Sequence, residues 1–124
     1  MPARVAPGIF TLPDGSAAIQ HASDYSLVTP ANPAGKGEVV IVYLTGLRQT
    51  CSASSANLGD ILYAGATPGF PGLDQINLRI SANAPSGNNQ LTMKFPACWG
   101  IGPEGIATAP ANDTTTNTVT LPVQ

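Results

Sequence analysis

Charge is what this chain has least of. Charged residues make up 10% of its 124 positions, against roughly 25% in an average soluble domain. Seven acidic and five basic side chains leave a formal net charge of −2, so the chain has no strong positive field with which to bind nucleic acid. A hydrophobic content of 43% combined with so little charge also excludes a chain that is disordered by self-repulsion.

Long hydrophobic runs are missing too. No apolar stretch approaches the roughly 18 residues that a membrane span requires, so no membrane span is predicted. The first ten residues, MPARVAPGIF, lack the apolar centre of a signal peptide. Either an export signal has been removed, or this is an excised module that begins with an added Met1.

The residue types of metal and catalytic sites are scarce or scattered. One histidine, His21, and two cysteines outside any CxxC or Cys/His cluster do not make up the usual four ligands of zinc. The single acidic residues form neither a facing carboxylate pair nor a calcium loop. His21 has Asp24 nearby, but no serine sits in a Gly-x-Ser-x-Gly setting, which favours an ordinary strand or surface histidine. We therefore predict no catalytic residue, no cofactor and no metal.

What the chain does have is turn formers and alternation. Thirteen glycines and twelve prolines punctuate it in turn-like groups such as Pro68-Gly69 and Pro71-Gly72. Between them, apolar and polar residues alternate over 75–80, 91–95 and 118–123, which is the period of a half-buried strand. This pattern predicts an all-β sandwich of about seven strands with minimal helix, in one domain.

One expected strand is apolar on both faces. Residues 39–44, VVIVYL, are flanked by Gly37 and Gly46, and two apolar faces imply a covering element on each side. The cover is either internal, such as segment 5–12, or a neighbouring domain or subunit. The extended segment 1–12 accordingly packs either on its own sandwich or on a neighbour by strand exchange.

The two cysteines, Cys51 and Cys98, are compatible with three interpretations of their chemistry. A disulfide would stabilise the fold by roughly 4 kcal/mol in the chain-entropy model and would place the protein in an oxidising compartment. Free buried or surface thiols are the second reading. Reactive chemistry is the third, with Arg48 as the basic neighbour that would lower a thiol pKa.

Several stretches, taken together and in order, resemble a known family. They are VAPGIFT (5–11), SLVTPANPA (26–34), YLTGL (43–47), ILYAG (61–65), PGFPGLDQINLRI (68–80), APSG (84–87) and NTVTLPV (117–123). The chain is similar to the uncharacterised Solibacter-type C-terminal domain of secreted acidobacterial proteins. That resemblance covers nearly the whole chain and implies an immunoglobulin-like β-sandwich appended to larger exported proteins. It assigns no catalytic or ligand-binding residue.

The chain departs from the family pattern in two places. Segment 48–60 is shorter than expected, and segment 96–116 is inserted where a short hairpin is usual. Each altered segment carries one cysteine, so the comparison with the family implies a Cys51–Cys98 bridge that tethers the two loops.

The aromatic residues give the candidate interaction surface. Trp99, in the glycine-rich stretch after Cys98, would either stack on a sugar or anchor a protein contact, or pack over the disulfide. Further candidates are Ile9, Phe10, Tyr43 and Phe70, with Tyr25 and Tyr63 as extensions of an aromatic platform. The motif Asn112-Asp-Thr114 fits a glycosylation acceptor as well as a polar loop.

These observations predict a non-catalytic extracellular or cell-surface module for structure or adhesion. Low net charge favours association, so the expected partners are proteins, either copies of the chain or domains of a parent protein. Strand contacts would then assemble the chain into a surface filament or array. The alternative is a carbohydrate-binding module that holds a polysaccharide on Trp99 and nearby aromatics.

Overall fold

The structure, a computed structural model, describes residues 8–45, 55–95, 100–101, 107–108 and 114–124. Cys51, Cys98, Trp99 and Asn112 lie outside the described residues. Within them the regular elements are all strands, which confirms the predicted all-β fold. The strands are β1 (Gly8–Ile9), β2 (Ile19–His21), β3 (Val39–Thr45), β4 (Ser55–Ala56), β5 (Gly59–Ala66), β6 (Asp74–Ile80), β7 (Gly87–Leu91), β8 (Met93–Phe95), β9 (Gly100–Ile101), β10 (Ala107–Thr108), β11 (Thr114–Thr115) and β12 (Val119–Val123).

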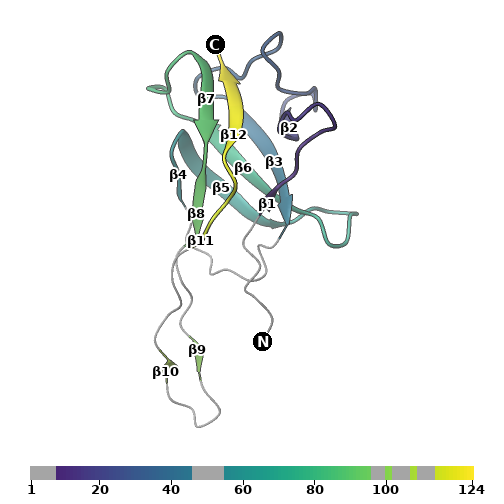
Figure 1. The fold of residues 1–124 in the computed structure, drawn as a ribbon, viewed down its shortest axis with the longest axis vertical. Coiled ribbons are helices and arrows are strands. Elements are labelled where there is room, and N and C mark those ends of the chain that lie inside the picture. The colour runs from purple at the N-terminus through teal and green to yellow at the C-terminus, as the bar shows by residue number, and fades with distance from the viewer. Residues whose placement is uncertain (1–7, 46–54, 96–99, 102–106, 109–113) are drawn as a thin grey trace.

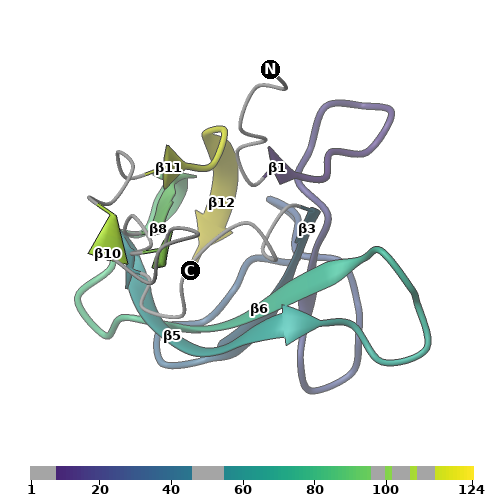
Figure 2. The same ribbon diagram turned by 90° about the horizontal axis from the view of Figure 1, so that it is seen from below.

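The strands form two layers. The main sheet runs β1-β3-β6-β5-β4-β8-β11, with β2 also paired to β3. Short strand β4 pairs with both β5 and β8, so it carries the sheet around a corner into the second layer. Strands β7 and β12 form a separate antiparallel pair there, and β9 pairs with β10. Figure 2 shows β5 and β6 in one layer and β8, β11 and β12 in the other.

The alternation in the sequence is what divides core from surface. In β3 the residues Val40, Val42 and Leu44 are fully buried, and β6 places Leu78 and Ile76 opposite the first two of them. The second layer completes the core with side chains that are also fully buried: Leu91, Met93 and Leu121. Burying such side chains is the main favourable term in forming the sandwich.

Two asparagine side chains form hydrogen bonds with backbone groups of neighbouring segments. The Ile9 amide donates to Asn117 Oδ1 at 2.7 Å, and Asn117 Nδ2 donates back to the Ile9 carbonyl at 3.2 Å. Asn57 Nδ2 donates to the Gln90 carbonyl at 2.7 Å, and Asn57 Oδ1 accepts from the Thr92 amide at 3.0 Å. A side-chain amide has the same donor and acceptor as a peptide group, so each asparagine extends the hydrogen bonding where no strand pairing is present.

The described part of the N-terminal segment belongs to its own sandwich. Strand β1 pairs antiparallel with β3, placing Gly8 opposite Thr45, and Thr11 forms a bridge with Ala17. Ile9, a candidate interaction residue in the sequence, is instead buried in the core with 4% of its surface exposed. Residues 1–7 of the predicted exchange segment lie outside the described residues.

The close approach of β5 to β6 requires a glycine at position 59. A Cβ built on Gly59 would lie 2.0 Å from the Arg79 carbonyl oxygen on β6, so only glycine fits at the start of β5. The hairpin that follows ends in a β5–β6 loop that juts sideways from the sandwich (Figure 1). No helix in the described part of the chain is long and apolar enough to cross a membrane.

Candidate functional site

The outer face of the main sheet carries the side chains that point away from the core. In β3 these are Val39, Ile41 and Tyr43. The strand register places Ile41 between Gln20 on β2 and Asn77 on β6, with Tyr63 of β5 beyond Asn77. One row across the sheet therefore presents two side-chain amides, an aliphatic group and an aromatic ring.

The next row is Tyr43, Gln75 and Gly65. The ring of Tyr63 lies over Gly65, because a Cβ on that glycine would meet the Tyr63 hydroxyl at 2.9 Å. The same hydroxyl donates to the Ala66 carbonyl at 2.9 Å. The missing side chain at position 65 thus leaves room for the aromatic ring on this face.

Beside these rows lies a concave site of about 320 Å³, which we name the outer-face hollow. Its lining includes three aromatic side chains and several aliphatic or polar ones: Tyr25, Tyr43, Phe70, Ile41, Thr67 and Gln75. Among the described residues, no Asp, Glu, Lys, Arg or His lines it. Tyr25 and Phe70 are 64% and 62% exposed, so their rings are available at its rim.

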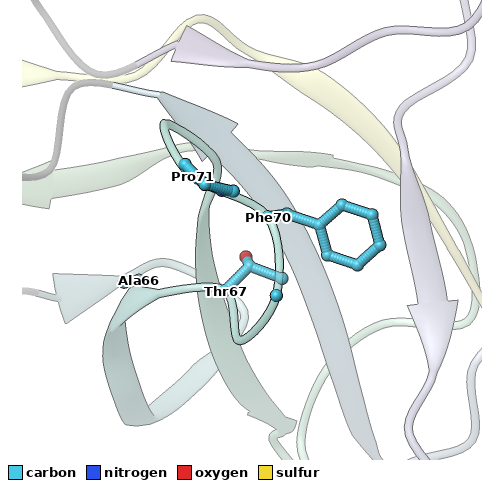
Figure 3. Close-up of a pocket in the computed structure, with 5 residues that line it drawn as sticks. Ala66, Thr67, Phe70 and Pro71 are labelled. Atoms are coloured by element: carbon cyan, nitrogen blue, oxygen red, sulfur yellow. The ribbon is translucent and has the colours of Figure 1, made fainter.

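Phe70 is held by two consecutive turns. The Phe70 amide donates to the Thr67 carbonyl at 3.2 Å, and the Leu73 amide donates to the Phe70 carbonyl at 3.1 Å. Each turn has proline followed by a glycine, and those glycines, Gly69 and Gly72, have φ angles of 80° and 83°. Proline followed by such a glycine is the signature of a type II turn. Figure 3 shows that the ring of Phe70 projects from this loop. The two turns restrict the backbone of the loop before any ligand binds.

Thr67 lies within the same loop. Its side chain is on the inner side of the loop, whereas the ring of Phe70 projects out of it (Figure 3). The residue is 8% exposed, and its hydroxyl oxygen is buried with no hydrogen-bond partner among the described residues. A buried, unpaired hydroxyl is costly, and it is the one such side-chain group in the described part of the chain.

Tyr25 enters the hollow from a strained backbone. Its φ angle is 61°, the single positive value at a residue other than glycine among those described. For such a residue the left-handed region costs roughly 1 to 2 kcal/mol. The conformation is held because the Tyr25 amide donates to the His21 carbonyl at 2.8 Å. Asp24 adds a local turn by accepting from the amide and the hydroxyl of Ser26, and these bonds lower the pKa of Asp24.

Tyr43 forms the floor of the hollow on the β3 side. Its hydroxyl donates to Gln20 Oε1 at 2.8 Å. Burial raises the pKa of this hydroxyl, and the neighbouring Tyr25 hydroxyl adds to the rise. Tyr43 is therefore a neutral hydrogen-bonding group at neutral pH.

His21 holds the segment that carries Tyr25 and does not contribute to the hollow. Its Nδ1 contacts Glu38 Oε2, and its Nε2 donates to the Asn32 carbonyl at 3.0 Å. Burial of the ring works to lower the pKa of His21. The Glu38 hydrogen bond, the Asn32 carbonyl and the charges of Glu38 and Asp24 outweigh that effect and raise it above the usual 6.5. The acidic partner is thus Glu38, not the Asp24 that stands near it in sequence.

The predicted interaction residues separate in space. Tyr43 and Phe70 meet at the hollow, whereas Phe10, 44% exposed, and the buried Ile9 are not among its lining residues. Trp99 and the proposed Cys51–Cys98 bridge fall outside the described residues.

Four lining residues are absent from the sequence-based candidates: Ile41, Thr67, Pro68 and Gln75. Gln75 alternates with apolar residues in its strand, and that position facing away from the core is the signal that could have found it.

The side chains gathered at the hollow are binding groups. Nowhere in the described ranges do three or more His, Cys, Asp or Glu side chains gather so as to hold a metal ion. The hollow itself contains aromatic faces, an amide and hydroxyls, which suit noncovalent recognition of a neutral partner.

Comparison with known proteins adds no relative. No family model matches the chain, and no curated protein and no solved structure matches it either. The similarity to the Solibacter-type domain and the immunoglobulin-like topology it implies therefore stay predictions that rest on the motifs quoted above.

Proposed function

We propose that this chain is a non-catalytic extracellular adhesion module that contacts its partner through the outer-face hollow. The observation that carries the proposal is the convergence of Tyr25, Tyr43 and Phe70, from three separate segments, on one neutral concavity. Exposed aromatic side chains in a concave, preorganised setting are typical of binding surfaces.

The described N-terminal residues favour this face over strand exchange. Strand β1 pairs with β3, the Phe10 amide donates to the Tyr43 carbonyl at 3.0 Å, and the Ile9 backbone is bonded to Asn117 of the same chain. A partner that replaced this strand would first have to break those bonds. Assembly into a filament through segment 1–12 is therefore less well supported than contact through the sheet face.

Adhesion of protein-coated beads tests the proposal. Beads carrying the full chain are applied to a surface coated with the same chain and to a surface coated with a neutral polysaccharide. We expect retention on at least one of them, and loss of that retention in a Tyr25→Ser, Phe70→Ser double variant. Phe10→Ser is the matched control, because Phe10 is an exposed aromatic residue outside the hollow.

Two results would overturn the proposal. One is wild-type beads that adhere to neither surface. The other is a double variant that adheres as well as the wild type while remaining folded.

A further inference from the structure

The outer-face hollow has the chemistry of a site for sugar rings. Resting on the adhesion function above, we propose that it binds a neutral polysaccharide chain, with pyranose rings stacked on Phe70 and Tyr25 and their hydroxyls bonded to the amides of the sheet. The proposal rests on Phe70 and Tyr25 and makes no use of Trp99, which lies outside the described residues.

Charge limits the ligand class first. The charged residues in the outer-face rows, Asp60 on β5 and Arg79 on β6, are opposite each other in register, toward the β6 end remote from Gln75. With no Asp, Glu, Lys, Arg or His among the lining residues that the structure describes, a phosphate, a uronic acid or a charged peptide would lose its hydration without gaining an ionic partner there. A neutral ligand avoids that penalty.

The aromatic rings provide the second requirement. The face of an aromatic ring carries partial negative charge, which attracts the slightly positive C–H groups on the apolar face of a pyranose. Phe70 and Tyr25 are both more than half exposed at the hollow. Because the two turns restrict the Phe70 loop, little backbone freedom is lost on binding.

Side-chain amides supply the third requirement. Gln75 Nε2 donates to Asn77 Oδ1 at 3.0 Å, which leaves one Gln75 N–H and its amide oxygen without a partner among the described residues. The Tyr43 hydroxyl, already donating to Gln20, can still accept a hydrogen bond. Sugar hydroxyls both donate and accept, so this mixed set matches them.

The size and extent of the surface suit a chain of sugars. A volume of about 320 Å³ is at the small end of the range for small-ligand sites. Tyr63, 44% exposed and on the same sheet face next to Asn77, extends the aromatic surface beyond the hollow. A linear polysaccharide therefore has room to continue across the sheet.

Titration of the full-length ¹⁵N-labelled chain with cellohexaose, xylohexaose and mannohexaose tests the inference, with oligogalacturonate as the charged probe. We expect at least one neutral probe to shift the amide signals of residues 41–43 and 67–75. Phe70→Ala and Tyr25→Ala should each weaken binding by about tenfold. Phe10→Ala should leave the affinity unchanged.

Two results would contradict the proposed sugar site. Binding that survives Phe70→Ala but is lost in Trp99→Ala overturns this site, as does equal or tighter binding of oligogalacturonate. The core amide signals of each variant show whether it has folded, and Tyr25→Gly provides a second variant lacking the ring.

Failure of the inference can also be told apart from failure of the adhesion function. If no neutral probe binds, the sugar site is overturned. If beads are then still retained on the protein-coated surface, and this retention depends on the hollow, the adhesion function is supported without the sugar site. If the beads are not retained there either, both proposals are overturned.

Discussion

The two faces of strands β3 and β6 are made of neighbouring residues and do different things. On one face Val40, Val42 and Leu44 are fully buried against the second layer. On the other, Ile41 and Tyr43 lie among side-chain amides and line the outer-face hollow. A single run of apolar sequence therefore contributes to stability through one set of positions and to recognition through the set between them.

The apolar run of β3 thus has a different explanation from the one its sequence suggests. Ile41 is only 6% exposed although it is not part of the core cluster, because it lies on the face of the sheet where Tyr25 and the β5–β6 loop form the hollow. The described N-terminal residues extend the edge of the sheet and do not lie over this face. The second apolar face of β3 is therefore the floor of a candidate binding site.

The largest expected difference between the two faces comes from adjacent positions on β6. Leu78→Ala removes a fully buried side chain and should lower the free energy of unfolding by about 2 to 5 kcal/mol. Asn77→Ala, the matched change on the outer face, should cost less than about 1 kcal/mol. Urea unfolding with a common slope measures the free energy of unfolding of both variants. Equal losses of stability would show that the two faces of β6 contribute equally to stability.

The edge of the sheet gives the second test. Asn117→Ala removes both hydrogen bonds to the Ile9 backbone and should cost about 1 to 3 kcal/mol. The Ile9 amide should also exchange faster with solvent.

Asn83→Ala, at an exposed turn position after β6, is the matched control for this second test. If loss of Asn117 changed neither stability nor exchange, β1 would be held by its strand pairing alone. The edge would then be open to the strand exchange that the sequence suggests.

Local pattern in the sequence was enough to predict several of the longer strands and some of the turns. The alternation at 75–80, 91–95 and 118–123 corresponds to β6, to β8 with the last residue of β7, and to β12, because the period of a strand is read directly from neighbouring residues. The two Pro-Gly pairs of the β5–β6 loop were also predictable as turns.

Contacts between distant segments could not be predicted in that way. Asn117 and Ile9 are 108 positions apart, and nothing near either residue indicates the other. His21 bonds to Glu38 and not to nearby Asp24 because β2 and β3 bring residue 38 alongside. The hollow combines Tyr25 with Phe70 for the same reason, since it depends on strand register and on the path of two loops.

A smaller effect should follow from the charge on His21. Its pKa is raised in the folded chain, so the protonated form is favoured by folding, and that stabilisation is fully present below the unfolded pKa of about 6.5. It is lost as the pH rises through the folded pKa. Thermal unfolding should therefore show a less stable protein at pH 8.5 than at pH 6.

His21→Gln provides the control for this pH effect. Glutamine keeps a hydrogen-bonding group but does not titrate, so the variant should lose the pH dependence between these values. An unchanged dependence in the variant would assign the effect to other groups. His21 holds the segment leading to Tyr25. A parallel weakening of sugar binding at high pH would therefore show that the charge on His21 also affects the hollow.

The smallest expected effect on stability is at Tyr25, where the comparison between the faces is sharpest. Its left-handed backbone is strained in a Tyr25→Ala variant as it is in the wild type, whereas Tyr25→Gly relieves the strain. The glycine variant should therefore be more stable than the alanine variant by about 1 kcal/mol, as measured by urea unfolding. At an unstrained surface position in a sheet glycine is the less stable of the two, so the reversed order is diagnostic. A strained residue that is retained without benefit to the core, and whose removal weakens binding about tenfold, would show that the outer face is maintained for recognition at a cost in stability.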